Sequence, residues 1–119
     1  MKFIPILITF LVFAPPWFSG GGNNGKGWEI ETIDAKGDIE RDTSICIYKD
    51  EVFISYYDIE SKNLKVASFV DGKWGIEIVD ASADVGAYSS IAVDSNGCLH
   101  LVYYDTTNEN LKYARKDGS

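Results

Sequence analysis

Residues 56–67 of the chain are YYDIESKNLKVA, and residues 103–114 repeat this stretch as YYDTTNENLKYA. The correspondence continues on both sides, because residues 28–72 match residues 74–118 at an offset of 46 that becomes 47 in the middle. The landmarks recur in the same order: Trp28 with Trp74, Asp34 with Asp80, Asp38 with Asp84, and Ser44-Ile45 with Ser90-Ile91. A match in this order does not arise from composition, and it predicts one structural unit that is repeated.

Each unit contains short segments with strand patterns. Residues 52–57 and 99–104 are apolar at successive positions, as in a strand that is covered on both faces. The other predicted strands are 28–33, 43–48, 64–69, 74–79, 89–94 and 111–115. Turn signals separate the segments, namely Lys49-Asp50, Asp71-Gly72-Lys73 and Ser95-Asn96-Gly97. No segment has helical periodicity, so we predict an all-β fold.

Four short antiparallel strands with a period in the mid-forties are typical of a β-propeller blade. The short Ser-Ile strand suits the crowded centre and the Trp strand suits the rim, so residues 43–79 are expected to form one complete blade. Residues 89–115 then supply three strands of a second blade, and residues 28–33 are a rim strand without a blade. Because closed propellers have about 4–8 blades, we predict an incomplete propeller. Its missing strands would come from self-association by edge-strand exchange, or from the remaining blades of a longer protein.

Residues 68–74 carry a family resemblance. This segment, SFVDGKW, resembles a shortened form of the Asp-box of sialidase-type β-propellers, which has the pattern Ser-x-Asp-x-Gly-x-Thr-Trp in the hairpin between the last two strands of a blade. It lacks one residue between Asp71 and Gly72 as well as the Thr, and the second copy has Ala114 in place of the Ser. The resemblance implies the propeller fold and leaves the activity open, because such propellers occur as glycosidases, lectins and non-catalytic surface modules.

The N-terminus has the features of an export signal. Met1 and Lys2 precede an apolar run at residues 3–14, which is shorter than the roughly 20 residues of a membrane span. We therefore expect a signal peptide over residues 1–19, a Gly-rich linker over 20–27, and two repeats over 28–73 and 74–119. An uncleaved hydrophobic anchor is the alternative.

Composition excludes several functions. The chain has 119 residues, enough for one small domain, and a formal net charge of -7, which argues against binding to a phosphate backbone. Two cysteines supply neither a disulfide lattice nor a four-cysteine zinc site. Cys46 and Cys98 are not equivalent in the repeat, so we expect free thiols. We predict no metal and no cofactor.

Candidate binding residues occur in the connections that should emerge on one face of a propeller. The five residues selected are Asp38, Asp58, Asp84, Tyr88 and Asp105. Two interpretations remain open. Repeated carboxylates beside tyrosine suit a cation or sugar hydroxyls, or the aspartates cap their own turns by accepting hydrogen bonds from nearby backbone N–H groups. Trp28 and Trp74 likewise either stack on a sugar or pack the rim strand against its neighbour.

The residue inventory does not favour catalysis. Sialidases, which the repeats resemble, hold the substrate carboxylate with three arginines, whereas this chain contains only Arg41 and Arg115. The single histidine, His100, aligns with Phe53, which predicts a packed position in the core. We therefore predict a secreted, non-enzymatic propeller module that binds carbohydrate or cell-surface ligands. The alternative is part of a sialidase-like glycoside hydrolase whose catalytic residues lie in other blades.

Overall fold

The computed structural model describes residues 27–39 and 42–118, and these contain seven β-strands and no helix. Residues 27–33 belong to one unit, and the described residues from Asp34 onward belong to a second unit that holds all seven strands. The strand predicted over residues 28–33 is wrong for this structure, because none of them is in a strand. A strand exists only where its backbone hydrogen-bonds to a neighbouring strand, and the strand pairing in this structure begins at Ser44.

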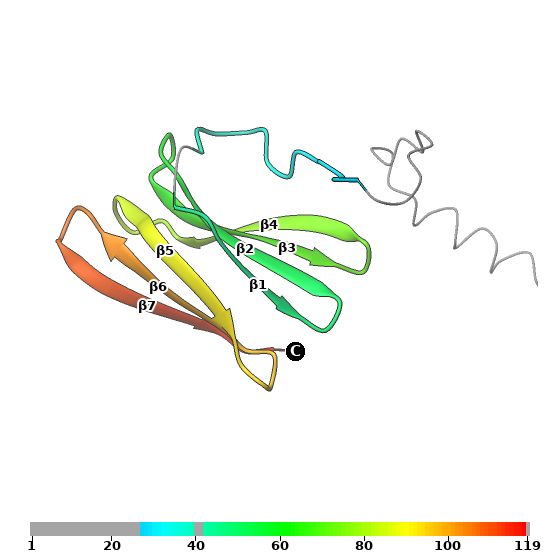
Figure 1. The fold of residues 1–119 in the computed structure, drawn as a ribbon. Helices are drawn as coiled ribbons and strands as arrows, with labels where there is room; N and C mark the ends of the chain where they lie inside the picture. Colours follow the sequence, from blue (N-terminus) through cyan, green and yellow to red (C-terminus); the bar gives the residue numbers. More distant parts are fainter. Residues whose placement is uncertain (1–26, 40–41, 119) are drawn as a thin grey trace, which may run out of the picture. The chain divides into compact units, whose positions relative to one another are not determined.

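The first sheet is antiparallel with the strand order β1-β2-β3-β4 (Figure 1). Its strands are β1 (Ser44–Tyr48), β2 (Glu51–Asp58), β3 (Asn63–Val70) and β4 (Lys73–Asp80). This confirms the predicted order within residues 43–79, in which the Trp74 strand lies at one edge and the Ser-Ile strand at the other. The hairpin between β3 and β4 turns at Asp71 and Gly72, whose φ values are 53° and 79°. Asp-Gly favours such a turn because both central residues need positive φ.

The second sheet has three antiparallel strands in the order β5-β6-β7. They are β5 (Val85–Val93), β6 (Leu99–Asp105) and β7 (Asn110–Lys116). β5 begins earlier than predicted and shifts register twice between Val85 and Ser90. Such β-bulges re-aim side chains locally. Among the described residues neither sheet closes on itself, so the structure establishes two antiparallel sheets without establishing propeller blades.

The two sheets pack face to face and enclose one apolar core (Figure 1). We call the faces that meet the inner faces, and the opposite faces the outer faces. The buried core residues are Phe53, Leu64, Val66, Val85, Ile91, Leu99, Leu101 and Tyr103. Hydrogen bonds also cross between the sheets, among them one between the Ser55 and Ser89 hydroxyls at 3.0 Å and one from the Ile91 N–H to Ser44 Oγ at 3.2 Å.

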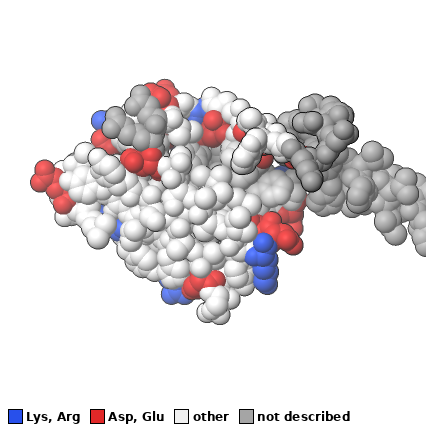
Figure 2. Space-filling model, viewed as in Figure 1, with Lys and Arg blue, Asp and Glu red and all other residues white. Residues whose placement is uncertain are grey.

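The prediction that β2 and β6 are covered on both faces is wrong in part. In β6, Leu101 is buried on the inner face, whereas Val102 on the outer face is 42% exposed. In β2, Phe53 is buried and Ile54 on the opposite face is half-buried. On the side of the molecule seen in Figure 2, uncharged side chains occupy much of the surface and the charged ones lie mostly near its edges. Apolar side chains on the outer faces are therefore partly open to solvent.

Candidate functional site

The loops that follow β2, β4 and β6 meet the segment before β1 at one end of the sheets. The Ile59 N–H donates a hydrogen bond of 2.9 Å to the Asp38 carbonyl, and the Thr106 N–H donates one of the same length to the Asp84 carbonyl. The Val85 N–H bonds to the Lys62 carbonyl at 3.2 Å. We call residues 34–39, 59–62, 81–84 and 106–109 the loop end. These connections therefore lie together at one end of the two sheets, whereas the propeller face on which they were expected stays a prediction.

Asp58 is a buried carboxylate that holds the β2–β3 turn. Its Oδ1 atom accepts hydrogen bonds from the backbone N–H groups of Glu60 at 3.1 Å and Ser61 at 3.3 Å, and Oδ2 accepts one from Lys65 Nζ at 2.5 Å. Burial alone would raise the pKa of the Asp58 carboxyl, but the hydrogen bonds from Lys65 and Ser61 outweigh it and hold the pKa at about 2. The carboxylate is therefore ionised at neutral pH and engaged within the fold.

Asp105 has the corresponding role in the β6–β7 turn. Its carboxylate accepts hydrogen bonds from the backbone N–H and the side-chain amide of Asn108, both at 2.9 Å. These bonds lower the pKa of the Asp105 carboxyl. The capping interpretation of Asp58 and Asp105 thus describes what the two carboxylates do in this structure. Their role as ligand-binding residues stays a prediction.

Asp34 lies within a cluster of polar side chains on the outer face of the first sheet. Its Oδ2 atom accepts a hydrogen bond of 2.8 Å from the Tyr56 hydroxyl and lies 3.9 Å from Lys65 Nζ. Burial, and then the contact with Asp34, raises the pKa of Tyr56 far above its ordinary range. The Lys36 N–H also donates to Asp34 Oδ1 at 2.9 Å, so the same carboxylate fixes its own loop.

Asp80 repeats this arrangement on the inner face of the second sheet. Its Oδ2 atom accepts hydrogen bonds from the Tyr103 hydroxyl at 2.7 Å and from Lys112 Nζ at 2.5 Å, and its Oδ1 accepts one from the Ser82 N–H at 2.9 Å. Burial opposes ionisation, but the bonds from Lys112, Ser82 and Tyr103 lower the pKa of the Asp80 carboxyl well below its ordinary value. Both clusters thus join an aspartate to a tyrosine hydroxyl and a lysine, but Lys112 hydrogen-bonds to Asp80, whereas Lys65 hydrogen-bonds to Asp58 and lies 3.9 Å from Asp34.

The lysines of these clusters were not among the predicted site residues. The signal for them was present in the sequence, because Lys65 and Lys112 are the last residues of the repeated Asn-Leu-Lys triplet. A residue type retained at an equivalent position in both copies indicates a shared contact. What the sequence does not contain is the partner, since Lys112 and Asp80 are 32 residues apart.

Asp84 connects the two sheets, whereas Asp38 is exposed. Asp84 Oδ1 accepts a hydrogen bond of 2.6 Å from the Tyr57 hydroxyl, and the Asp84 N–H donates to Thr107 Oγ1 at 3.1 Å. Asp38 uses its backbone, since its carbonyl accepts from Ile59 and its N–H lies 3.4 Å from Asp58 Oδ1. Within the described residues the Asp38 carboxylate and the Tyr104 hydroxyl have no hydrogen-bond partner.

Tyr88 is the one aromatic residue among the five predicted site residues, and it is exposed to solvent. Its side chain is 72% exposed, and its ring centroid lies 6.3 Å from that of Tyr104. It occurs in the bulged part of β5 with a φ of 54°, a left-handed conformation that is uncommon for a bulky residue. Strained positions of this kind cluster at functional sites. The structure thus presents an aromatic ring to solvent near the loop end.

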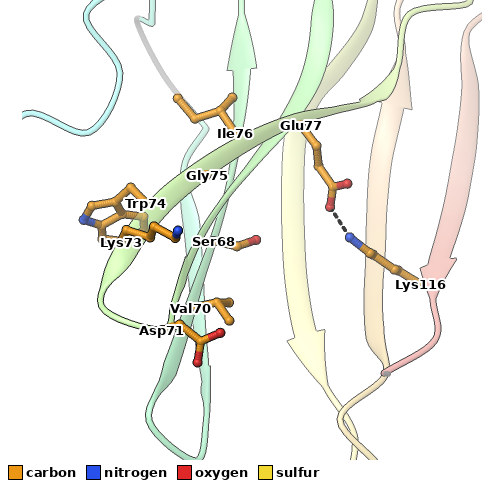
Figure 3. Close-up of a pocket in the computed structure, with 9 residues that line it drawn as sticks. All are labelled: Ser68, Val70, Asp71, Lys73, Trp74, Gly75, Ile76, Glu77 and Lys116. Carbon is orange, nitrogen blue, oxygen red and sulfur yellow. Dashed lines mark hydrogen bonds and ion pairs between the residues drawn. The ribbon is translucent and has the colours of Figure 1, made fainter. Parts of the chain in front are cut away.

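A groove lies beside β4, away from the loop end. It has a volume of about 380 Å³ and is open to solvent, and its lining side chains include Ser68, Trp74 and Glu77 (Figure 3). Trp74 packs against Phe69 with ring centroids 5.3 Å apart, so the packing interpretation of Trp74 is confirmed. Across the groove, Lys116 Nζ of β7 lies 2.6 Å from Glu77 Oε1.

The predictions for the thiols and for histidine had different outcomes. Cys46 and Cys98 are both free, as expected.

His100 does not occupy the core, so that prediction is wrong. Its ring lies on the partly exposed outer face of the second sheet, 2.7 Å from the Tyr113 hydroxyl and 2.9 Å from Asp94 Oδ2. The alignment with Phe53 put His100 on the correct face of its strand, but no third sheet covers that face among the described residues.

Across residues 27–39 and 42–118, no group of three or more histidine, cysteine, aspartate or glutamate side chains is arranged to hold a metal ion. The same residues include no helix of the length and apolarity needed to cross a membrane. Comparisons of the chain with protein-family models, with curated proteins and with solved structures found no match.

Proposed function

We propose that the chain is a secreted, non-catalytic module of β-propeller-type repeats that binds a carbohydrate or cell-surface partner at its loop end. One observation carries the repeat part of the proposal. The cluster of Asp34 with Tyr56 recurs as Asp80 with Tyr103, and these positions are related by the offsets of the sequence repeat. Equivalent residues making equivalent contacts support consecutive copies of one structural unit.

The ionisation of the carboxylates supports a non-catalytic role. A glycosidase needs one carboxylic acid that is still protonated near neutral pH, which requires a raised pKa. The pKa values of Asp58, Asp80 and Asp105 are all lowered instead, and each carboxylate is engaged in hydrogen bonds within the fold. These groups stabilise loops and are poorly suited to deliver a proton.

An exposed aromatic ring supports binding at the loop end. Tyr88 and Tyr104 place two tyrosine rings beside each other, and aromatic rings with a polar tip suit surfaces that are both apolar and wet. Asp84 and Thr107 lie at the same end of the second sheet and contribute polar atoms. This combination matches a sugar, which offers C–H groups to a ring and hydroxyls to polar side chains.

The binding proposal is tested with the intact exported chain on an array of immobilised glycans, followed by titration calorimetry with a glycan that binds. Tyr88→Ala is expected to abolish binding, and Tyr113→Ala, which removes another exposed tyrosine of the same sheet, is expected to retain it. Absence of binding to every glycan, or equal loss in both variants, would overturn the assignment. Hydrolysis of the bound glycan would overturn the non-catalytic part.

Export is tested separately. Expression from Met1 should yield a shortened protein outside the cell, with a new N-terminus between residues 14 and 21. N-terminal sequencing decides this, and an intact Met1 on protein that is fully retained by the cell contradicts it.

A further inference from the structure

By the sequence repeat, the outer face of the first sheet corresponds to the inner face of the second sheet, which is buried. Ile45 and Ile47 of β1 are 60% and 62% exposed on this face. At an offset of 46, Ile45 corresponds to Ile91, which is only 6% exposed because the first sheet covers it. At an offset of 47, further residues of this face correspond to residues on the inner face of the second sheet: Val52 with Leu99, Ile54 with Leu101, Tyr56 with Tyr103 and Ala67 with Ala114. This face therefore carries the residues of a sheet-packing surface.

On the outer face of the second sheet, exposed residues likewise correspond to residues that are buried on the inner face of the first sheet. Leu111 and Tyr113 of β7 are 80% and 58% exposed. Their counterparts at an offset of 47, Leu64 and Val66, are buried at 0% and 1% beneath the second sheet. Exposed apolar surface of this kind marks an interaction site when it is contiguous. The outer face of the first sheet thus corresponds to the inner face of the second, and the outer face of the second sheet corresponds to the inner face of the first. The two inner faces already pack together within the chain.

We propose that copies of this chain associate head to tail, with the outer face of β1–β4 of one copy packed on the outer face of β5–β7 of the next. This continues the internal interface between the sheets across a boundary between chains. It rests on the repeat part of the proposed function and not on ligand binding. Because the contact joins two different surfaces, it generates a ring when the rotation closes.

A specific polar contact follows from the same correspondence. Inside the chain, the Tyr57 hydroxyl on the first sheet bonds to Asp84 before the second sheet. The counterparts of these residues are Tyr104 and Asp38. Both groups lack a hydrogen-bond partner among the described residues, and Asp38 is exposed. In the proposed interface, the Asp38 carboxylate of one copy accepts a hydrogen bond from the Tyr104 hydroxyl of the next.

Sedimentation equilibrium of the exported chain tests the association. A discrete oligomer is expected, and Tyr104→Phe and Asp38→Ala should each raise its dissociation constant about tenfold or more. The double variant should add little to either single change, because both remove one contact. Tyr57→Phe is the matched control, since it removes the contact inside the chain and should leave the dissociation constant of the folded protein unchanged.

A second variant tests the packed faces independently. Ile47→Glu places a charge on the outer face of the first sheet and should abolish the oligomer, while Ser95→Glu, at an exposed turn outside the interface, should not. A folded monomer of the parent chain would overturn the proposal, and then other blades would have to cover these faces. Association that survives Ile47→Glu, or that grows without a defined stoichiometry, would overturn it as well. Glycan binding by a monomer would leave the proposed function standing.

Discussion

The Tyr57 hydroxyl donates a hydrogen bond of 2.6 Å to Asp84 Oδ1 and thereby connects the first sheet to the loop that begins the second. Tyr57 points from β2 toward the inner face, and Asp84 is held by Thr106 and Thr107 of the next turn. The bond therefore fixes the loop end at the point where the two sheets meet. Near it, the Ser55 and Ser89 hydroxyls make a second polar contact between the sheets.

Tyr57→Phe should lower the free energy of unfolding by about 1–3 kcal/mol, because it leaves a half-buried carboxylate without its donor. Urea unfolding followed by far-ultraviolet circular dichroism measures the change. Tyr48→Phe is the matched control, since the Tyr48 hydroxyl makes only a long bond of 3.4 Å at an exposed site. Equal losses of unfolding free energy in the two variants would show that the Tyr57–Asp84 hydrogen bond stabilises the protein no more than an exposed one does.

Leu101→Ala and Ile54→Ala compare counterpart positions in the two sheets. Leu101 is 3% exposed in the core, so its truncation should cost about 2–5 kcal/mol in the free energy of unfolding. Ile54 is half-buried on the outer face, so its loss should be clearly smaller in dilute protein.

The concentration dependence of the Ile54→Ala loss is informative as well. If copies associate through the outer faces, the loss should grow as the protein concentration rises, whereas the Leu101→Ala loss should grow little. A large loss for Ile54→Ala in a sample shown by sedimentation to be monomeric would contradict the assignment of the outer face.

The strands were predictable because their patterns are local. Seven of the eight predicted segments are strands, and Asp71-Gly72 turns where its residue types require. Residues 28–33 have the same alternation as a strand but are not one, because a strand also needs a partner, and pairing is not encoded in the segment itself. The same limit explains why Val102 and His100 were wrongly predicted to be buried. The sequence indicates which face of the strand they occupy, but it does not indicate whether another sheet covers that face.

The sequence predicted that the candidate residues lie near one another, but it did not predict the contacts that their side chains make. The sequence repeat correctly brought Asp38, Asp58, Asp84 and Asp105 to neighbouring loops. Whether a carboxylate faces solvent or its own backbone depends on turn geometry and on distant donors such as Lys65 and Lys112, which spacing alone does not specify. The bulge that exposes Tyr88 left no clear signal, because it depends on the pairing of β5 with β6.

Gly86→Ala should destabilise the protein by about 2 kcal/mol or more. Gly86 has a φ of 116°, and an added Cβ would lie 2.9 Å from the Leu64 Cα atom, which belongs to the buried part of β3. Gly75→Ala is the matched control, because its Cβ would meet nothing within 4 Å. The control should be neutral or stabilising by up to about 1 kcal/mol. Thermal unfolding of both variants decides, and a neutral Gly86→Ala would contradict the close approach of β3 and β5.

Stability should fall in acid through the carboxylates of the loop end. The hydrogen bonds from Lys65 and Ser61, which outweigh burial, hold the folded pKa of Asp58 at about 2, below its ordinary value of 3.8. A lowered folded pKa contributes stability that is fully present above the ordinary value and is lost as the pH falls toward the folded one. The contribution of Asp58 is roughly 2 kcal/mol, and Asp80 acts in the same direction.

The free energy of unfolding, measured in urea between pH 6 and pH 2, should therefore decrease mainly below about pH 5. Asp58→Asn removes the titrating group, and Lys65→Met removes the cation that lowers its pKa, so both variants should be less stable at pH 6 and lose less stability on acidification. An acid dependence identical to that of the parent chain in both variants would show that the Asp58–Lys65 pair does not hold the β2–β3 turn.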